Sequence, residues 1–149
     1  MRLIKARKGR HEILDPAQPK LEQLGKSLLP AQQNRLWQIT LQMYGPYVYD
    51  AQGMPTALGL NDTDIARINS ELNTVSHAYE VKVDQYVKAH HVQYHLVGGD
   101  MMVPIETPEI RKINEEKESK LMAAMHHSLS KSQNERLSEL LGAPFKLSG

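Results

Sequence analysis

The chain has 149 residues, and its 18 basic and 17 acidic side chains leave a formal net charge of +1 at neutral pH. So small a net charge produces no global field that would attract nucleic acid or an anionic bilayer, and we expect neither as a partner. The absence of cysteine excludes disulfides, thiolate metal sites and cysteine nucleophiles. Aromatic residues are few, whereas helix-favouring Leu, Met, Gln, Glu, Lys and Ala are plentiful, so we predict an all-α fold.

Residues 1–12, "MRLIKARKGRHE", are expected to form a basic flexible arm. No hydrophobic region follows these cations, so no signal peptide is visible, and no stretch of about eighteen apolar residues predicts membrane insertion. Residues 13–149 are predicted to form a single helical domain. Its first helix should begin at Pro16 or Pro19, because proline is favoured in the first turn of a helix.

A second helix is predicted from Pro30 to the Gly45-Pro46 pair, which stops it. Residues 45–59 contain several further turn-forming residues, "GPYVYDAQGMPTALG". We expect this segment to be an irregular connection whose tyrosines and Val48 pack back on the helices.

The longest predicted helix begins after Asn61, where apolar side chains recur every three or four residues. This spacing places them on one face of a helix and predicts a single buried stripe. The stripe consists of Ile65, Ile68, Leu72, Val75, Tyr79, Val83, Tyr86 and His90. The glycines of "VGGDMMVP" at 97–104 then interrupt the helix.

Thr107 and Pro108 are predicted to start the next helix, because threonine caps helix N-termini and proline suits the first helical position. Its expected buried positions are Ile110, Ile113, Leu121 and Met125. The simplest partner is the preceding helix, folded back as an antiparallel hairpin. A short helix from Lys131 to Leu141 completes an all-α fold of four to five helices around this long hairpin. We expect a dimer, because two long helices expose more apolar surface than short helices cover.

A short pattern recurs three times: a leucine, an amide or acidic residue four positions later, then arginine and an aliphatic residue. The copies are Leu28, Gln32, Arg35 and Leu36; Leu60, Asp64, Arg67 and Ile68; and Leu129, Gln133, Arg136 and Leu137. The pattern is typical of a helix entrance, in which a cap and the side chain three positions on bond each other's backbone. Asn61 and Ser130 are the predicted caps, whereas Leu29 cannot accept a hydrogen bond. Asp62 and Asp64 fit the positive end of a helix dipole.

The segments "LLPAQ", "LNDTD" and "LSKSQ" resemble the Leu-Thr-x-x-Gln (LTxxQ) motif of the Spy/CpxP-like family of small helical envelope stress proteins. The order of features, from "RLWQITLQ" to "LSKSQNERLSELLGAPF", is similar to that family across roughly residues 20–146. The resemblance implies an ATP-independent periplasmic chaperone, or a stress- or metal-responsive protein, that binds unfolded or partner proteins as a homodimer. The alternative is a non-enzymatic structural or interaction subunit of a larger assembly.

No catalytic, cofactor or metal site is predicted, and we do not expect an enzyme, because no nucleophile, nucleotide or zinc-protease motif is present. Met101 and Met102, in the glycine-containing loop, are expected to contact a partner, since thioethers adapt to varied surfaces.

The histidines leave one alternative open. His91 and His95 are four apart on the expected helix. A hairpin turn near residue 101 would also set His77 level with Met125, close to His126 and His127. Whether His77, His126 and His127 bind a metal is undecided by sequence, and exposed helix histidines are the commoner case.

Overall fold

The computed structural model describes residues 29–98 and 101–145. The predicted arm at 1–12 and the predicted helix from Pro16 or Pro19 lie outside these ranges. The described chain is mostly helical, which confirms the predicted class at that level. It also contains a two-stranded sheet that the sequence analysis did not predict.

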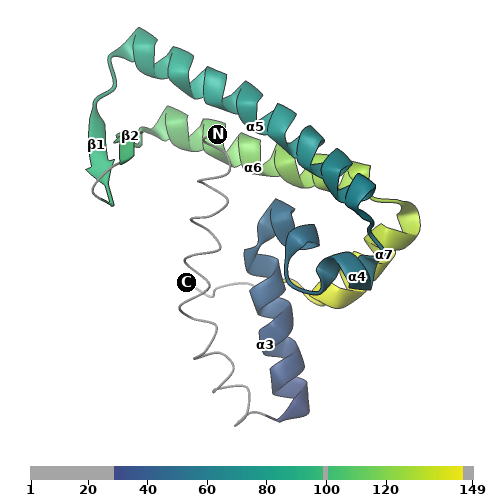
Figure 1. Cartoon of the computed structure of the whole chain (residues 1–149). Coiled ribbons are helices and arrows are strands. Elements are labelled where there is room, and N and C mark those ends of the chain that lie inside the picture. Colours follow the sequence, from purple (N-terminus) through teal and green to yellow (C-terminus); the bar gives the residue numbers. More distant parts are fainter. Residues whose placement is uncertain (1–28, 99–100, 146–149) are drawn as a thin grey trace.

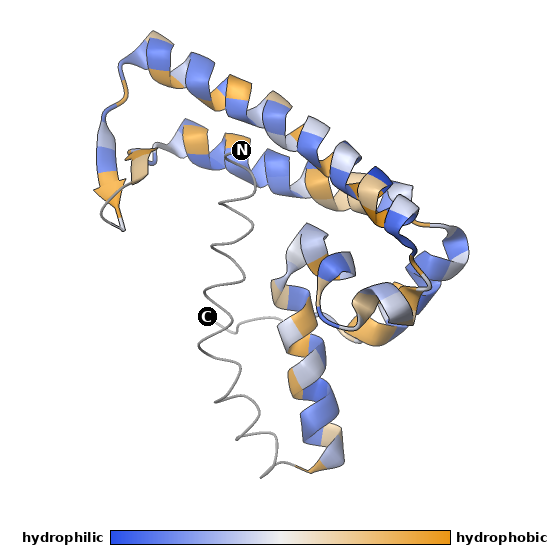
Figure 2. Ribbon diagram, in the orientation of Figure 1, coloured by the Kyte–Doolittle hydropathy of each residue, from blue (hydrophilic) through white to orange (hydrophobic). Residues whose placement is uncertain are grey.

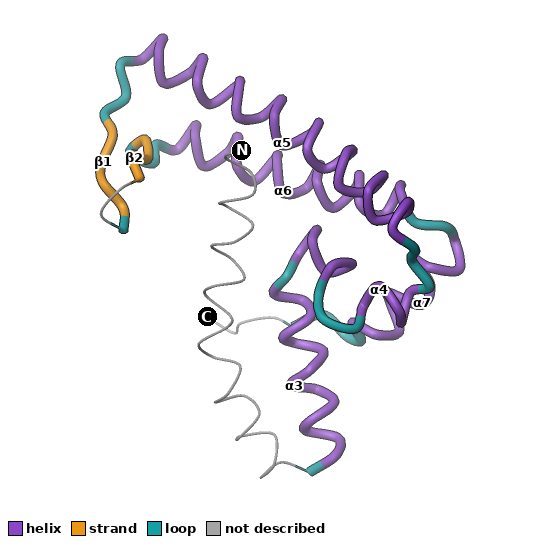
Figure 3. Tube along the Cα trace, viewed as in Figure 1, coloured by secondary structure: helices purple, strands orange, loops and turns teal. Residues whose placement is uncertain are grey.

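The helices and strands of the described residues follow one another along the chain in a fixed order. They are α3 (Pro30–Met43), the 3-10 helix η1 (Gly45–Asp50), α4 (Met54–Leu58), α5 (Asp62–His90), β1 (Tyr94–Val97), β2 (Met101–Pro104), α6 (Pro108–Ser128) and α7 (Lys131–Leu141). Helices α3, α4 and α7 gather at one end of the paired α5 and α6 (Figure 1). The β1–β2 ribbon joins α5 to α6 at the opposite end (Figure 3).

Side-chain contacts fix how α5 and α6 lie against each other. Ser128 Oγ, at the end of α6, donates to Glu71 Oε2, near the start of α5, at 2.8 Å. Further along, Lys82 Nζ lies 3.8 Å from Glu116 Oε1. The two helices therefore run in opposite directions, and facing residues have numbers that sum to about 198.

The helix entrances are capped as the sequence predicted. Asn61 Oδ1 accepts the Asp64 amide at 2.9 Å, and Asp64 Oδ2 accepts the Asn61 amide at 3.2 Å. Ser130 and Gln133 make the same reciprocal pair, at 3.2 and 2.9 Å. Thr107 Oγ1 accepts the amide three positions on, at 3.2 Å. These bonds satisfy amides that a helix leaves without an internal partner, so they fix where α5, α6 and α7 begin.

The core lies where α3, η1, α4 and α7 meet the α5–α6 pair. Its members include Leu41, Val48, Tyr49, Met54, Leu58, Ile68, Leu72, Leu121, Met125, Leu129 and Leu137. Residues 45–59, expected to be irregular, instead form η1 and α4, because Pro46 and Pro55 suit the first turns of helices. Tyr49 packs back on α5 as expected, and its hydroxyl donates to Asn69 Oδ1 at 2.7 Å.

The predicted stripe on α5 is buried along most of its length. Ile68, Leu72 and Tyr79 are buried, while other members are partly buried. At the far end of the helix Val87 takes the buried position and His90 is exposed, which corrects the prediction for His90. The burial face turns gradually because a straight helix has 3.6 residues per turn.

Gln42 joins α3 to the last described residues. Its Nε2 donates to the carbonyl oxygens of Leu141, at 2.7 Å, and Ala143, at 3.0 Å. Its Oε1 accepts the Phe145 amide at 2.7 Å. Arg35 Nη1 adds a bond to the Ala143 carbonyl at 2.8 Å, so two polar side chains of α3 hold the segment after α7 in place.

Candidate functional site

The main group of exposed apolar side chains in the described chain lies on the β1–β2 ribbon. We call it the ribbon patch, and it consists of Tyr94, Leu96, Val97, Met101, Met102 and Ile105, each between 40% and 64% exposed. Figure 2 shows this apolar end of the molecule next to mainly hydrophilic outer faces of α5 and α6. Met101 and Met102 are exposed, and they lie on strand β2 and not in the expected loop.

Local sequence explains why the helix gives way to a ribbon. His91 adopts the left-handed conformation, with φ 48°, and its amide bonds the Val87 carbonyl to end α5. The following "VQYHLV" is rich in β-branched and aromatic residues, which favour strands. Gly98, with φ 64°, begins the reversal toward β2. The expected placement of His91 and His95 on one helical face is therefore wrong.

Both faces of the ribbon are apolar. Tyr94 stands opposite Pro104 and Leu96 opposite Met102, and these pairs share one face because side chains alternate along a strand. The other face carries His95 opposite Val103 and Val97 opposite Met101. Apolar residues on both faces are typical of strands that are covered on both sides. Within the described strands, His95 is the sole side chain that can carry charge near neutral pH.

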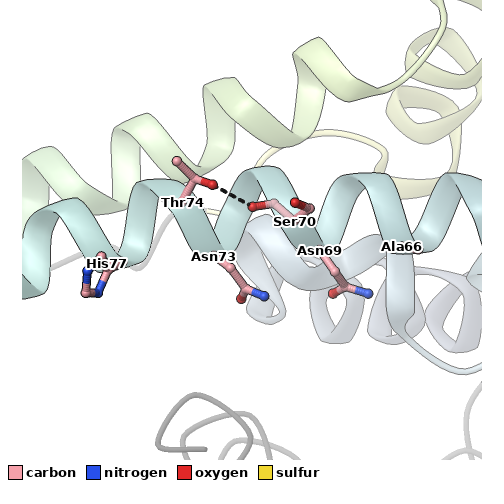
Figure 4. Close-up of a pocket in the computed structure, with 6 residues that line it drawn as sticks. All are labelled: Ala66, Asn69, Ser70, Asn73, Thr74 and His77. Carbon is pink, nitrogen blue, oxygen red and sulfur yellow. Dashed lines mark hydrogen bonds between the residues drawn. The ribbon is translucent and has the colours of Figure 1, made fainter.

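A second surface feature is a shallow groove along α5, on the side that faces away from α6. Its lining residues are Ala66, Asn69, Ser70, Asn73, Thr74 and His77. The side chains of Asn69, Asn73 and His77 point away from α6, whereas Thr74 Oγ1 donates to the Ser70 carbonyl at 2.9 Å (Figure 4). The groove offers amide, hydroxyl and imidazole groups that can form hydrogen bonds, and Ala66 is the one residue in its lining without a polar side chain.

The three histidines considered for metal binding are not brought together. His77 points away from α6, which carries His126 and His127 (Figure 4). The pairing of α5 with α6 also sets His77 nearer to Leu121 than to Met125, about one helical turn from the predicted position. The sequence prediction failed because it placed the reversal too late in the chain. Within residues 29–98 and 101–145, no three His, Cys, Asp or Glu side chains form a group that could hold a metal ion.

The Tyr79 phenol connects α5 to α6 through Glu116. Burial raises the pKa of Tyr79, and a hydrogen bond to Glu116 and the negative charge of that carboxylate raise it further. Lys82 Nζ lies 4.1 Å from the centroid of the Tyr79 ring. The phenol therefore stays protonated at neutral pH and donates to Glu116, a role that joins the two helices.

A scan against protein-family models, a search of curated proteins and a search of solved structures each found no match. The Spy/CpxP-like resemblance therefore stays a prediction. None of the helices in the described ranges has both the length and the apolar character needed to cross a bilayer.

Proposed function

We propose that this protein is a Spy/CpxP-like binding protein of the periplasm that holds unfolded or stress-damaged proteins without ATP. The observation that carries the proposal is the ribbon patch, with its two exposed methionines, Met101 and Met102. Unbranched thioether side chains adapt to partners of different shape, which suits a surface that binds many sequences.

The geometry supports weak and reversible binding. Burying exposed apolar surface contributes roughly 25 cal/mol per Å², and association costs several kcal/mol in lost freedom of motion. For a patch of six partly exposed side chains, the free energy gained by burial exceeds the cost of association only slightly. Clients should therefore exchange readily. The patch is almost uncharged, so higher salt should change binding only modestly.

The proposal also assigns a role to the α5–α6 pair, as the long antiparallel hairpin of a homodimer. Helix α5 has 29 residues, which corresponds to a length of about 43 Å. The hairpin thus holds the ribbon patch far from the core around Tyr49, and a client can bind without disturbing that core. Large exposed apolar side chains are scarce on the two long helices, where Val81 is the main example. The contact surface of the dimer is therefore better sought on the ribbon than on the helical stripe.

Light scattering by a chemically unfolded client tests the proposal. The protein, at a few-fold molar excess and without ATP, should slow aggregation. The double variant Leu96→Ser/Met102→Ser should lose most of this protection. The matched control Met43→Ser/Val81→Ser also replaces two exposed apolar side chains, on α3 and α5, and should keep it. Protection equal to that of an inert protein across several clients would remove the chaperone function.

The alternative is a structural or interaction subunit of a larger assembly, favoured by the outer strand edges of the ribbon, which no other described strand covers. A permanent partner would bind with fixed stoichiometry and dissociate slowly, because obligate interfaces are large and well packed. Titration calorimetry separates the alternatives: saturable, tight binding of one folded partner supports the subunit, and weak binding of many unfolded chains supports the chaperone. The positions of His77, His126 and His127 give no support to a metal-responsive role.

A further inference from the structure

The two outer edges of the ribbon differ in their hydrogen-bonding capacity. The Ile105 amide donates to the Gln93 carbonyl at 2.8 Å, which makes residues 93 and 105 a hydrogen-bonded pair. In an antiparallel ladder such pairs alternate with pairs whose backbone groups point outward. The register therefore turns the backbone of residues 94 and 96 toward the outer edge of β1, and that of residues 102 and 104 toward the outer edge of β2.

Only one of these edges is fully available for another strand. At the β1 edge, Tyr94 and Leu96 each present an N–H and a C=O. At the β2 edge, Pro104 has no N–H, and proline on an edge strand blocks the addition of a neighbour. Among the residues that the structure describes, no further strand pairs with the β1 edge, which is thus open, and the β2 edge is protected.

The ribbon is also short of the strands that a stable sheet needs. A two-stranded ribbon is marginally stable in water, and three or more strands with an apolar face are needed for independent stability. All four residues of β1 are exposed. A strand added at the β1 edge would extend both apolar faces of the sheet and lower the exposure of Leu96 and Tyr94.

We infer that β1 pairs antiparallel with β1 of a second copy of this chain, which gives a four-stranded sheet with two-fold symmetry. The inference deepens the proposed function by naming what occupies the ribbon when no client is bound. A symmetric pair of identical strands is self-complementary, as closed dimers require.

The hydrogen bonds select one register. Residues whose backbone groups point to the outer edge of β1 must lie opposite such residues of the second copy. The two-fold axis can therefore lie beside Tyr94, His95 or Leu96. An axis at Tyr94 needs the Val92 amide, which already bonds the Val87 carbonyl at 3.1 Å. An axis at Leu96 needs an extended Gly98, which has φ 64°. With the axis at His95, Tyr94 pairs with Leu96 of the second copy and every outward group of β1 is bonded.

This register places His95 directly opposite its counterpart, in the type of pair whose Cα atoms are about 4.5 Å apart. With both imidazoles uncharged, the described strands bring no like charges together, so two copies are electrically compatible. Two imidazolium ions at this distance would repel each other, and like charges directly opposite destabilise a sheet. Across the ribbon, β2 sets Val103 opposite His95 and contributes no titratable group. Along the chain, the titratable residues nearest to His95 are Tyr94 and His91 before it and Asp100 after it. The dimer should therefore weaken under acidic conditions in which both imidazoles carry a proton.

Sedimentation equilibrium of the full chain tests the pairing with two matched proline variants. Leu96→Pro removes an outward N–H from β1, and Met102→Pro removes the equivalent N–H from β2; neither touches the bonds between the strands. Wild type and Met102→Pro should dimerise, while Leu96→Pro should dimerise at least tenfold more weakly with unchanged helical circular dichroism. A monomeric wild type at about 100 μM, or equal association of the two variants, would overturn the inference.

The register has its own test, because the chain contains no cysteine. His95→Cys should form an intermolecular disulfide on mild oxidation, since a Cα separation near 4.5 Å is within the range for disulfides. Met102→Cys, also at an exposed position but on the other strand, should not. Equal cross-linking of both variants contradicts the register. These measurements contain no client, so a dimer without chaperone activity would refute the proposed function alone, and a monomeric chaperone would refute this inference alone.

Discussion

Gln32 Oε1 accepts the backbone amide of Leu29 at 2.9 Å, at the entrance to α3. This is half of the reciprocal arrangement that Asn61 with Asp64 and Ser130 with Gln133 complete at α5 and α7. The other half is missing at α3 because the Leu29 side chain has no acceptor. Leu29 is 68% exposed and has the extended backbone of a cap residue, so the position is ready for a polar side chain.

Leu29→Ser should therefore stabilise the protein by about 0.5–1 kcal/mol, because the serine hydroxyl can accept the amide of Gln32 and complete the capping box. Urea unfolding followed by circular dichroism measures the change. Leu29→Ala, which supplies no acceptor, should give little gain, and Ser130→Ala should cost about 1 kcal/mol. Equal effects of serine and alanine at position 29 would contradict the capping explanation.

Gly142→Ala should destabilise the protein by about 1–3 kcal/mol. Gly142 has φ 62° and ψ −160°, a region open almost exclusively to glycine, and an added Cβ would lie 2.5 Å from the Gln38 side chain. Gly59→Ala is the matched control: its φ of 65° and ψ of 35° lie in the left-handed helical region, with open space around the new Cβ. Thermal unfolding should show the larger loss at position 142, and a loss at position 59 of similar size would show that neither the ψ of Gly142 nor its approach to Gln38 is important.

We expect the folded protein to lose stability at alkaline pH because of the Tyr79 phenol. Its pKa is raised in the folded protein, by burial and then by Glu116, so the folded state holds this proton more tightly than the unfolded chain. The resulting stability is fully present below the unfolded pKa, about 10, and is lost as the pH rises through the raised folded pKa. Urea unfolding between pH 8 and pH 11 should show a steeper decline for wild type than for Tyr79→Phe. Tyr94→Phe, at an exposed position, should behave like wild type.

Local rules made the helices predictable. The Lys131–Leu141 helix has the predicted bounds because a serine cap and Gly142 mark its two ends. Thr107 with Pro108 marks the start of α6 in the same way. In each case the signal and the structure lie within a few residues of each other, so one sequence is sufficient to recognise them.

The ribbon could not be predicted in the same way. Its strands are four residues long, and the helical pattern of α5 continues plausibly to His95 unless His91 takes the left-handed conformation. Because α5 ends at this turn, the chain reverses toward α6 earlier than the predicted residue 101. His77 is therefore not level with His126 and His127. The spacing of apolar residues shows which face of a helix is buried. Which residues of two paired helices lie opposite each other depends on the connection between the helices. The β-branched and aromatic residues of "VQYHLV" favour a strand, but a segment of this length does not distinguish a strand from the end of a helix.

Hydrogen exchange of the full chain, with and without an excess of an unfolded client, tests the central claim most directly. If the ribbon patch is the contact surface, amides in residues 92–98 and 101–105 should exchange more slowly with client present, while those of α3 and α7 should not change. Protection confined to the groove between Ala66 and His77, or no protection at the ribbon under conditions where the client is held soluble, would contradict the account.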